Sequence, residues 1–214
     1  MKRKHIIFLI NGKRRSGKGL LTNAIKQKCN EKFNNNIHVL SFAQPIKSIT
    51  EPILNELNWD GKDKEVVRPL WIAMGEVGRK IDNNIWCSKV FNKIKDLVIE
   101  SSKNEQNSMY IIDDLRFPNE LDFFKGNLNQ IKEKLNTKTD EVSVVSIRIE
   151  KFIDAEKFVP GVDDNSTEIS FDKLVNICFD HIVPQNTLIN NEWIAQFDKV
   201  DIIADVVIKN FIKF

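Results

Sequence analysis

The chain has 214 residues, of which 42% are hydrophobic and 29% are charged, a balance that predicts one ordinary globular domain. A formal net charge of +2 argues against a protein built around duplex DNA or anionic lipid. The three cysteines, Cys29, Cys87 and Cys178, are far apart and odd in number, which argues against a disulfide framework or a zinc site. The apolar run at 6–10 is too short for a signal peptide or a membrane span, so we expect a cytoplasmic protein.

Short apolar runs alternate with helical patterns along the chain. Five of these runs predict β-strands, at 6–10, 38–42, 109–112, 142–149 and 181–183. They are rich in Ile and Val without strict alternation, which is typical of strands that are buried on both faces of a parallel sheet. Apolar residues at steps of three and four predict helices at 21–33, 70–81, 90–98 and 193–211. The alternation predicts a doubly wound α/β fold with right-handed crossovers.

Two stretches interrupt this alternation. Residues 126–141 are polar and rich in Lys and Asn, with only a weak helical stripe, and we expect a surface insertion there. Residues 152–171 contain Pro160-Gly161 and an acidic cluster, and they lie between the last two predicted strands. A mobile lid is expected in this second stretch.

The most specific motif follows the first predicted strand and opens the first predicted helix. It reads Gly12-Lys13-Arg14-Arg15-Ser16-Gly17-Lys18-Gly19, with the spacing Gly-x-x-x-x-Gly-Lys. Glycines let the backbone wrap closely around phosphate oxygens, and the successive amides and the helix dipole attract an anion. Lys18 can reach the β- and γ-phosphates of ATP. Gly19 stands where a Mg²⁺-binding Ser or Thr is usual, so the metal would need water, phosphates and another carboxylate.

A second cluster closes the third predicted strand. Asp113 and Asp114 end the run 109–112, and Arg116 follows them. In a parallel sheet, an acid at the carboxyl end of a strand faces the crevice in which ligands bind. Either acid could hold Mg²⁺ through water or orient an acceptor phosphate, and the planar guanidinium of Arg116 suits a phosphoryl group.

These motifs occur in an order that resembles the deoxynucleoside monophosphate kinases of tailed phages and the related phosphomevalonate kinases. The similar blocks are 12–18, 41–47, 74–79 and 112–120, with Arg68, Asp82 and Trp86 around the third. The resemblance implies a P-loop kinase fold, in which helices flank a five-stranded parallel sheet. It also implies one domain over 1–214, with an acceptor-binding helical region at about 45–100 and a small lid at about 150–170.

The resemblance further implies the site and its ligands, which are ATP, Mg²⁺ and a small phosphorylated acceptor. The expected catalytic residues are Lys18, Asp114 and Arg116, and the expected metal ligands are Asp113 and Asp114. The donor nucleotide is assigned to Gly12, Lys13, Arg14, Arg15, Ser16, Gly17, Lys18, Gly19, Leu20 and Asn186. The acceptor is assigned to Lys47, Arg68, Arg79, Asp82, Trp86 and Glu168.

The sequence of the expected lid bears on which of two candidate acceptors is used. Phage enzymes tend to have His-x-Ser-Glu there, whereas this chain has Asn165-Ser166-Thr167-Glu168 without the histidine, and its segment 158–164 resembles the phosphomevalonate kinase lid. The leading interpretation is phosphoryl transfer from ATP to a deoxynucleoside monophosphate. Mevalonate 5-phosphate is the rival acceptor, and an ATP-binding module without kinase activity is the third alternative. No nucleic acid polymer or membrane is expected as a partner, a homodimer stays open, and a viral source would place the protein in the host cytoplasm.

Overall fold

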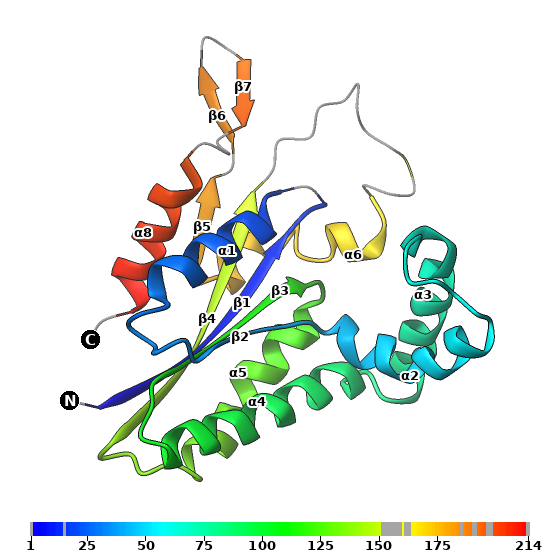
Figure 1. Cartoon of the computed structure of the whole chain (residues 1–214). Coiled ribbons are helices and arrows are strands. Elements are labelled where there is room, and N and C mark those ends of the chain that lie inside the picture. The colour runs from blue at the N-terminus through cyan, green and yellow to red at the C-terminus, as the bar shows by residue number, and fades with distance from the viewer. Residues whose placement is uncertain are drawn as a thin grey trace.

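The computed structural model describes residues 2–14, 16–150, 160, 164–184, 186–189, 192–195 and 199–212. Its centre is a five-stranded sheet in the order β2-β3-β1-β4-β5, in which every pairing is parallel (Figure 1). The strands are β1 (Arg3–Gly12), β2 (Ile37–Leu40), β3 (Ser108–Leu115), β4 (Asp140–Glu150) and β5 (His181–Pro184). This confirms the predicted α/β fold with its five-stranded parallel sheet.

Helices cover both faces of this sheet. On one face lie α1 (Lys18–Cys29) and α8 (Val200–Phe211), and on the other lie α4 (Ile85–Lys103) and α5 (Pro118–Lys132) (Figure 1). The helices α2 (Ala43–Glu56) and α3 (Lys64–Ile81) pack together to one side of the sheet. Two short helices, α6 (Ser166–Ile169) and α7 (Val175–Cys178), follow β4, and β6 (Asn186–Ile189) pairs with β7 (Glu192–Ala195) as a separate antiparallel ribbon.

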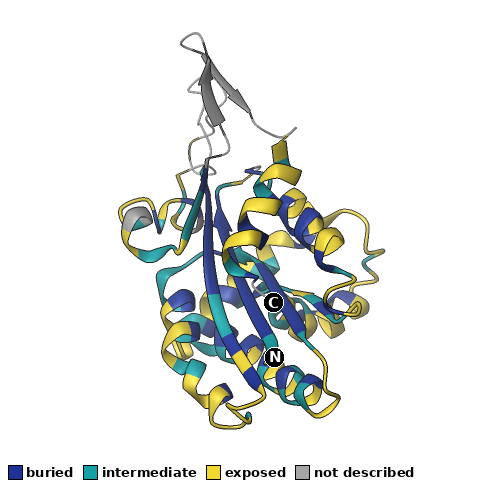
Figure 2. Ribbon diagram, turned by 90° about the vertical axis from the view of Figure 1, so that its left-hand side faces the viewer, coloured by how far each residue is buried: buried dark blue, intermediate teal, exposed yellow. Residues whose placement is uncertain are grey.

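The central strand β1 is buried on both faces because its side chains alternate between two cores. Ile6, Phe8 and Ile10 enter the core under α1 and α8, whereas Ile7 and Leu9 enter the core under α4 and α5. Figure 2 shows the buried strands running between the two layers of helices. The end of β1, where the phosphate loop begins, is therefore firmly held.

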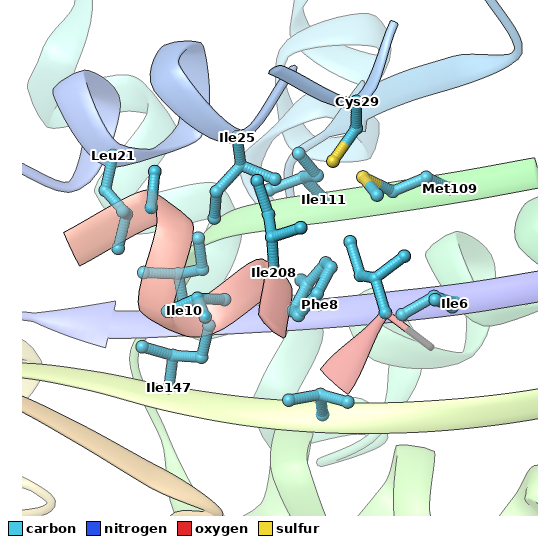
Figure 3. Close-up of a cluster of buried hydrophobic side chains, with 14 of the residues drawn as sticks. Ile6, Phe8, Ile10, Leu21, Ile25, Cys29, Met109, Ile111, Ile147 and Ile208 are labelled. Carbon is cyan, nitrogen blue, oxygen red and sulfur yellow. The ribbon is translucent and has the colours of Figure 1, made fainter. Parts of the chain in front are cut away.

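Figure 3 shows the first of these cores at close range. Leu21 and Ile25 of α1 and Ile208 of α8 converge with Phe8 of β1 and Ile147 of β4. All five side chains are at most 9% exposed. This apolar contact fixes the axis of α1 relative to β1, and so it fixes the two ends of the phosphate loop.

Two predictions about elements are wrong. Residues 126–141 are not a surface insertion, because 126–132 complete α5, whose Phe124 and Ile131 are fully buried. The many polar residues of that stretch weakened the periodic apolar pattern that predicts a helix. The stripe at 193–211 is not one helix either, since 192–195 form β7 and α8 begins only at Val200.

Most of the expected lid, at 151–159 and 161–163, lies outside the described residues. Its last part forms α6. Among the described helices, none is both long enough and apolar enough to cross a lipid bilayer.

Candidate active site

The loop between β1 and α1 is shaped by two glycines. Gly17, immediately before α1, has a φ of 87°, a left-handed conformation that favours glycine. A Cβ atom added to Gly12 would lie 2.5 Å from Ser16 Oγ and 3.0 Å from the carbonyl oxygen of Ile149, so a side chain does not fit there. Ser16 Oγ is itself buried and has no hydrogen-bond partner within the described residues. A buried hydroxyl without a partner is unfavourable, and a phosphate oxygen would satisfy it.

Lys18 lies folded over this loop. Its Nζ donates hydrogen bonds to the carbonyl oxygens of Gly12, at 2.7 Å, and Lys13, at 2.9 Å. Burial, reinforced by the nearby charge of Arg116, lowers the pKa of Lys18 to about 8, although Glu168 and Asp113 oppose that shift. An incoming phosphate would favour the charged form of Lys18 and would offer it a stronger acceptor than a carbonyl group.

The two acids at the end of β3 point to different neighbours. Asp114 is fully engaged, because its carboxylate accepts hydrogen bonds from Ser41 Oγ at 2.6 Å and from the amides of Phe42 at 2.9 Å and Ala43 at 3.1 Å. It thereby anchors the start of α2. Asp113 accepts one hydrogen bond, from Thr22 Oγ1 at 3.3 Å, and burial together with the charge of Asp114 raises its pKa.

Asp113 is consequently the better of the two candidates for Mg²⁺. Within the part of the chain that the structure describes, no three His, Cys, Asp or Glu side chains gather as a metal site. Mg²⁺ is commonly held by one or two carboxylates, water and substrate phosphates. Among the described residues, a Cβ atom at Gly19 would meet nothing within 4 Å.

Arg116 and Glu168 meet beside the phosphate loop. Arg116 Nη1 donates to Glu168 Oε1 at 2.8 Å and to the carbonyl oxygen of Gly12 at 3.5 Å. The other carboxylate oxygen of Glu168 accepts from the backbone amide of Arg14 at 2.5 Å. Glu168 is only 7% exposed, so an acid from α6 is held against the loop at the amide of Arg14.

A cavity of about 250 Å³ opens between α2, α3 and the residues that follow β3. Its cations come from all three elements: Lys47, Arg68, Arg79 and Arg116. Its aromatic walls are Phe42, Trp71, Trp86 and Phe117. A site that combines several cations with flat apolar walls suits an anion attached to a planar or apolar body.

Trp86 and Asp82 have clear packing roles in this region. Trp86 is 4% exposed, and its Nε1 donates to the carbonyl oxygen of Gly75 at 3.0 Å. A Cβ atom on Gly78 would lie 2.2 Å from the Trp86 ring, so the ring fills the space that this glycine leaves on α3. Asp82 ends α3 and accepts from the amide of Asn84 at 2.9 Å, outside the lining of the cavity.

Most of the residues expected at the site therefore lie around the phosphate loop or the cavity, and their assignment to ligands stays a prediction. Leu20 is exposed on the first turn of α1. Arg15 lies outside the described residues, and although the backbone of Asn186 begins β6, its side chain is not described.

Sequence reasoning missed Glu120, which is one of the residues that line the cavity. Its Oε2 accepts hydrogen bonds from the amides of Arg116 at 2.8 Å and Phe117 at 3.0 Å. Burial raises the pKa of Glu120 to about 7, against the effect of these two amides. The signal in the sequence was Pro118 at a helix start with Glu two positions later, a spacing typical of helix caps.

Comparisons with known proteins give one family match and several similar folds. A family model described as phosphomevalonate kinase matches residues 10–130, which include the phosphate loop, α2, α3 and Arg116. No curated protein matches the chain. Thymidylate kinase from Ehrlichia chaffeensis superposes with a TM-score of 0.46 and 16% identity, covering 96% of this chain and 99% of that one. A fungal RNA kinase has a TM-score of 0.45 and 15% identity, covering 98% of this chain and 88% of that one.

Proposed function

Since this chain belongs to the phosphomevalonate kinase family of P-loop kinases, we propose that it transfers the γ-phosphoryl group of ATP to a deoxynucleoside monophosphate. One observation carries the proposal. Arg116 contacts the phosphate loop at Gly12 and also lines the cationic cavity, so a single guanidinium adjoins both the donor site and the acceptor site. Phosphoryl transfer requires two anionic substrates to be held in line with their repulsion neutralised.

On the donor side, the loop amides, Lys18 and the Ser16 hydroxyl, which has no partner among the described residues, would bind the triphosphate. Asp113 would hold Mg²⁺ through water, and the bound ion would help to neutralise the charge on the phosphates. Since the transition state of phosphoryl transfer is loose, the protein needs no covalent nucleophile. We expect these residues to position the phosphates and to supply fixed positive charge.

On the acceptor side, Arg68 and Arg79 of α3 face the cavity together with Lys47 of α2. Two of these cations already lie over aromatic rings. The guanidinium of Arg79 is 5.0 Å from the ring centre of Phe117, and the Nζ of Lys47 is 5.2 Å from that of Trp71. Flat rings beside phosphate-binding cations favour an acceptor that carries a planar base.

A second acceptor is favoured by a different observation. The matching family model is described as phosphomevalonate kinase, so mevalonate 5-phosphate is the rival substrate. Its body is small, aliphatic and anionic, and it has no ring to pack on the aromatic walls. The aromatic lining of the cavity is our reason for placing the deoxynucleotide first.

A coupled assay of ADP release, with the four deoxynucleoside monophosphates and mevalonate 5-phosphate as acceptors, tests the proposal. We expect turnover with at least one deoxynucleotide. The Arg79→Ala variant should raise the KM for that acceptor about 10- to 100-fold, because a hydrogen bond to a charged group contributes roughly 1.5–3 kcal/mol. Lys80→Ala is the matched control, since Lys80 is exposed on α3 and does not line the cavity.

The possible outcomes separate the alternatives. Turnover with mevalonate 5-phosphate alone would replace the proposed acceptor while keeping the reaction. Tight ATP binding without turnover of any acceptor would instead favour a nucleotide-binding module that lacks kinase activity.

A further inference from the structure

The phosphate loop already holds an anion, which comes from the protein itself. The carboxylate of Glu168 accepts from the amide of Arg14 at 2.5 Å and from Arg116 Nη1 at 2.8 Å. Backbone amides of such a loop and a neighbouring arginine are the donors that a nucleotide phosphate would use. We propose that Glu168 is an internal competitor of the nucleotide, bound in the phosphate site of the free protein and displaced when a triphosphate binds. This inference rests on the proposed function.

Further contacts draw the segment 166–172 onto the same site. Asp172 bridges two cations, with Oδ2 at 2.7 Å from Lys13 Nζ and Oδ1 at 3.1 Å from Arg148 Nη2. Ser170 Oγ donates to the carbonyl oxygen of Arg116. The segment therefore neutralises cations around the phosphate loop that would otherwise attract a triphosphate.

The displacement can be confined to α6. Phe171, two positions after the end of α6, is 1% exposed and packs in the core with α4 and α5, so it can stay in place. Within α6, Ser166 is exposed and Ile169 is 43% exposed, whereas Glu168 is 7% exposed. Among the α6 side chains whose burial is described, Glu168 is thus the most buried, and its contacts are the ones that displacement would break.

Electrostatic interactions determine whether the Glu168 carboxylate or a triphosphate occupies the site. A triphosphate carries several negative charges, and a carboxylate at hydrogen-bond distance from the same amide would be repelled by it. A protein that is closed most of the time binds its ligand more weakly, in proportion to the fraction that is open. Removing the charge of Glu168 should accordingly tighten binding. If about nine molecules in ten are closed, the gain is roughly tenfold.

Release of Glu168 also changes the acceptor site. Arg116 lines the acceptor cavity, and its contact with Glu168 neutralises it in the free protein. When the carboxylate leaves, this guanidinium becomes available to an acceptor phosphate. Donor binding would thus prepare the second site, a positive coupling that is reciprocal by thermodynamic necessity.

Calorimetric titration with inorganic tripolyphosphate tests the inference on the whole chain. We expect Glu168→Gln to bind tripolyphosphate about tenfold more tightly than the parent protein. Asp205→Asn is the matched control, because it removes the ion pair of Lys28 and Asp205 between α1 and α8 and should leave the affinity unchanged.

Equal or weaker binding by Glu168→Gln, beside clear binding by the parent protein, would refute the competition and leave the proposed function intact. If neither protein binds tripolyphosphate, both proposals fail. The two failures are therefore distinguishable by the parent protein alone.

Backbone hydrogen exchange on the parent protein gives an answer even if the variant does not fold. Displacement predicts that tripolyphosphate makes the amides of 166–170 exchange faster. A segment that instead closes over the ligand would exchange more slowly, and that result would overturn the proposal.

Discussion

Replacing Glu120 by Gln should change how the stability of the protein depends on pH, while the folded structure stays nearly the same. The carbonyl oxygen of Gln can accept the two hydrogen bonds that Glu120 Oε2 takes from the amides of Arg116 and Phe117, but Gln cannot ionise. Burial is the largest cause that raises the pKa of Glu120 from 4.5 to about 7, and Asp114 adds to it. The folded protein consequently keeps, between these two pH values, a proton that the unfolded chain releases.

The sign of the effect follows from this proton. Stability contributed by protonated Glu120 is fully present below pH 4.5 and is lost as the pH rises through about 7. A difference of about 2.5 pKa units, at 1.36 kcal/mol each, gives a loss of about 3 kcal/mol between pH 4.5 and pH 8. The Glu120→Gln variant should not show this loss. The free energy of unfolding of the variant, relative to that of the parent protein, should therefore increase by about the same amount between pH 4.5 and pH 8.

Urea unfolding, followed by tryptophan fluorescence at pH 5 and pH 8, measures the difference. Glu133→Gln is a suitable control, since Glu133 is an exposed carboxylate at the end of the same helix. If the free energies of unfolding of Glu120→Gln and of the parent protein change equally between the two pH values, then Glu120 is not the buried acid described here.

Two further predictions concern Lys18 and the glycines of the helices. Because Lys18 has a pKa of about 8 in the free protein, ATP binding above that pH should take up a proton and weaken by up to about tenfold per pH unit. Calorimetry in buffers of different ionisation enthalpy would detect the proton, and an affinity that is constant from pH 7 to 10 would contradict the reasoning. Gly78→Ala should destabilise the protein by about 1–3 kcal/mol, because the new Cβ would lie 2.2 Å from Trp86. Gly126→Ala in α5 meets nothing within 4 Å and should stabilise by about 0.5–1 kcal/mol, so similar thermal unfolding of the two variants would argue against this packing.

The parts of the fold that the sequence predicts well are those governed by local chemistry. Runs of Ile and Val marked every strand of the parallel sheet, and the glycine spacing marked the turn into α1. The helix α5 was missed because Lys and Asn on its exposed side outnumber the buried Phe124 and Ile131 in the pattern. A periodic signal weakens when only one narrow face of a helix is buried.

Contacts between distant residues explain what was missed at the site. Asp113 and Asp114 are equivalent in a motif, but the pleat of β3 sends them to opposite sides, toward Thr22 of α1 and toward Ser41, which lies just before α2. Glu168 was expected to bind substrate. No sequence pattern predicts its hydrogen bond with the amide of Arg14, which lies 154 positions away. Such pairings arise only when the chain is folded.

The composition of α3 has a consequence for how this protein is assembled. The helix contains Pro69, which removes a backbone hydrogen bond, as well as Gly75 and Gly78, which are weak helix formers. A peptide with this sequence should be largely unstructured, so α3 gains its shape from docking on α2 and on Trp86 of α4. The region of α2 and α3 should therefore consolidate late in folding, and heat-sensitive substitutions should accumulate where α3 meets α4.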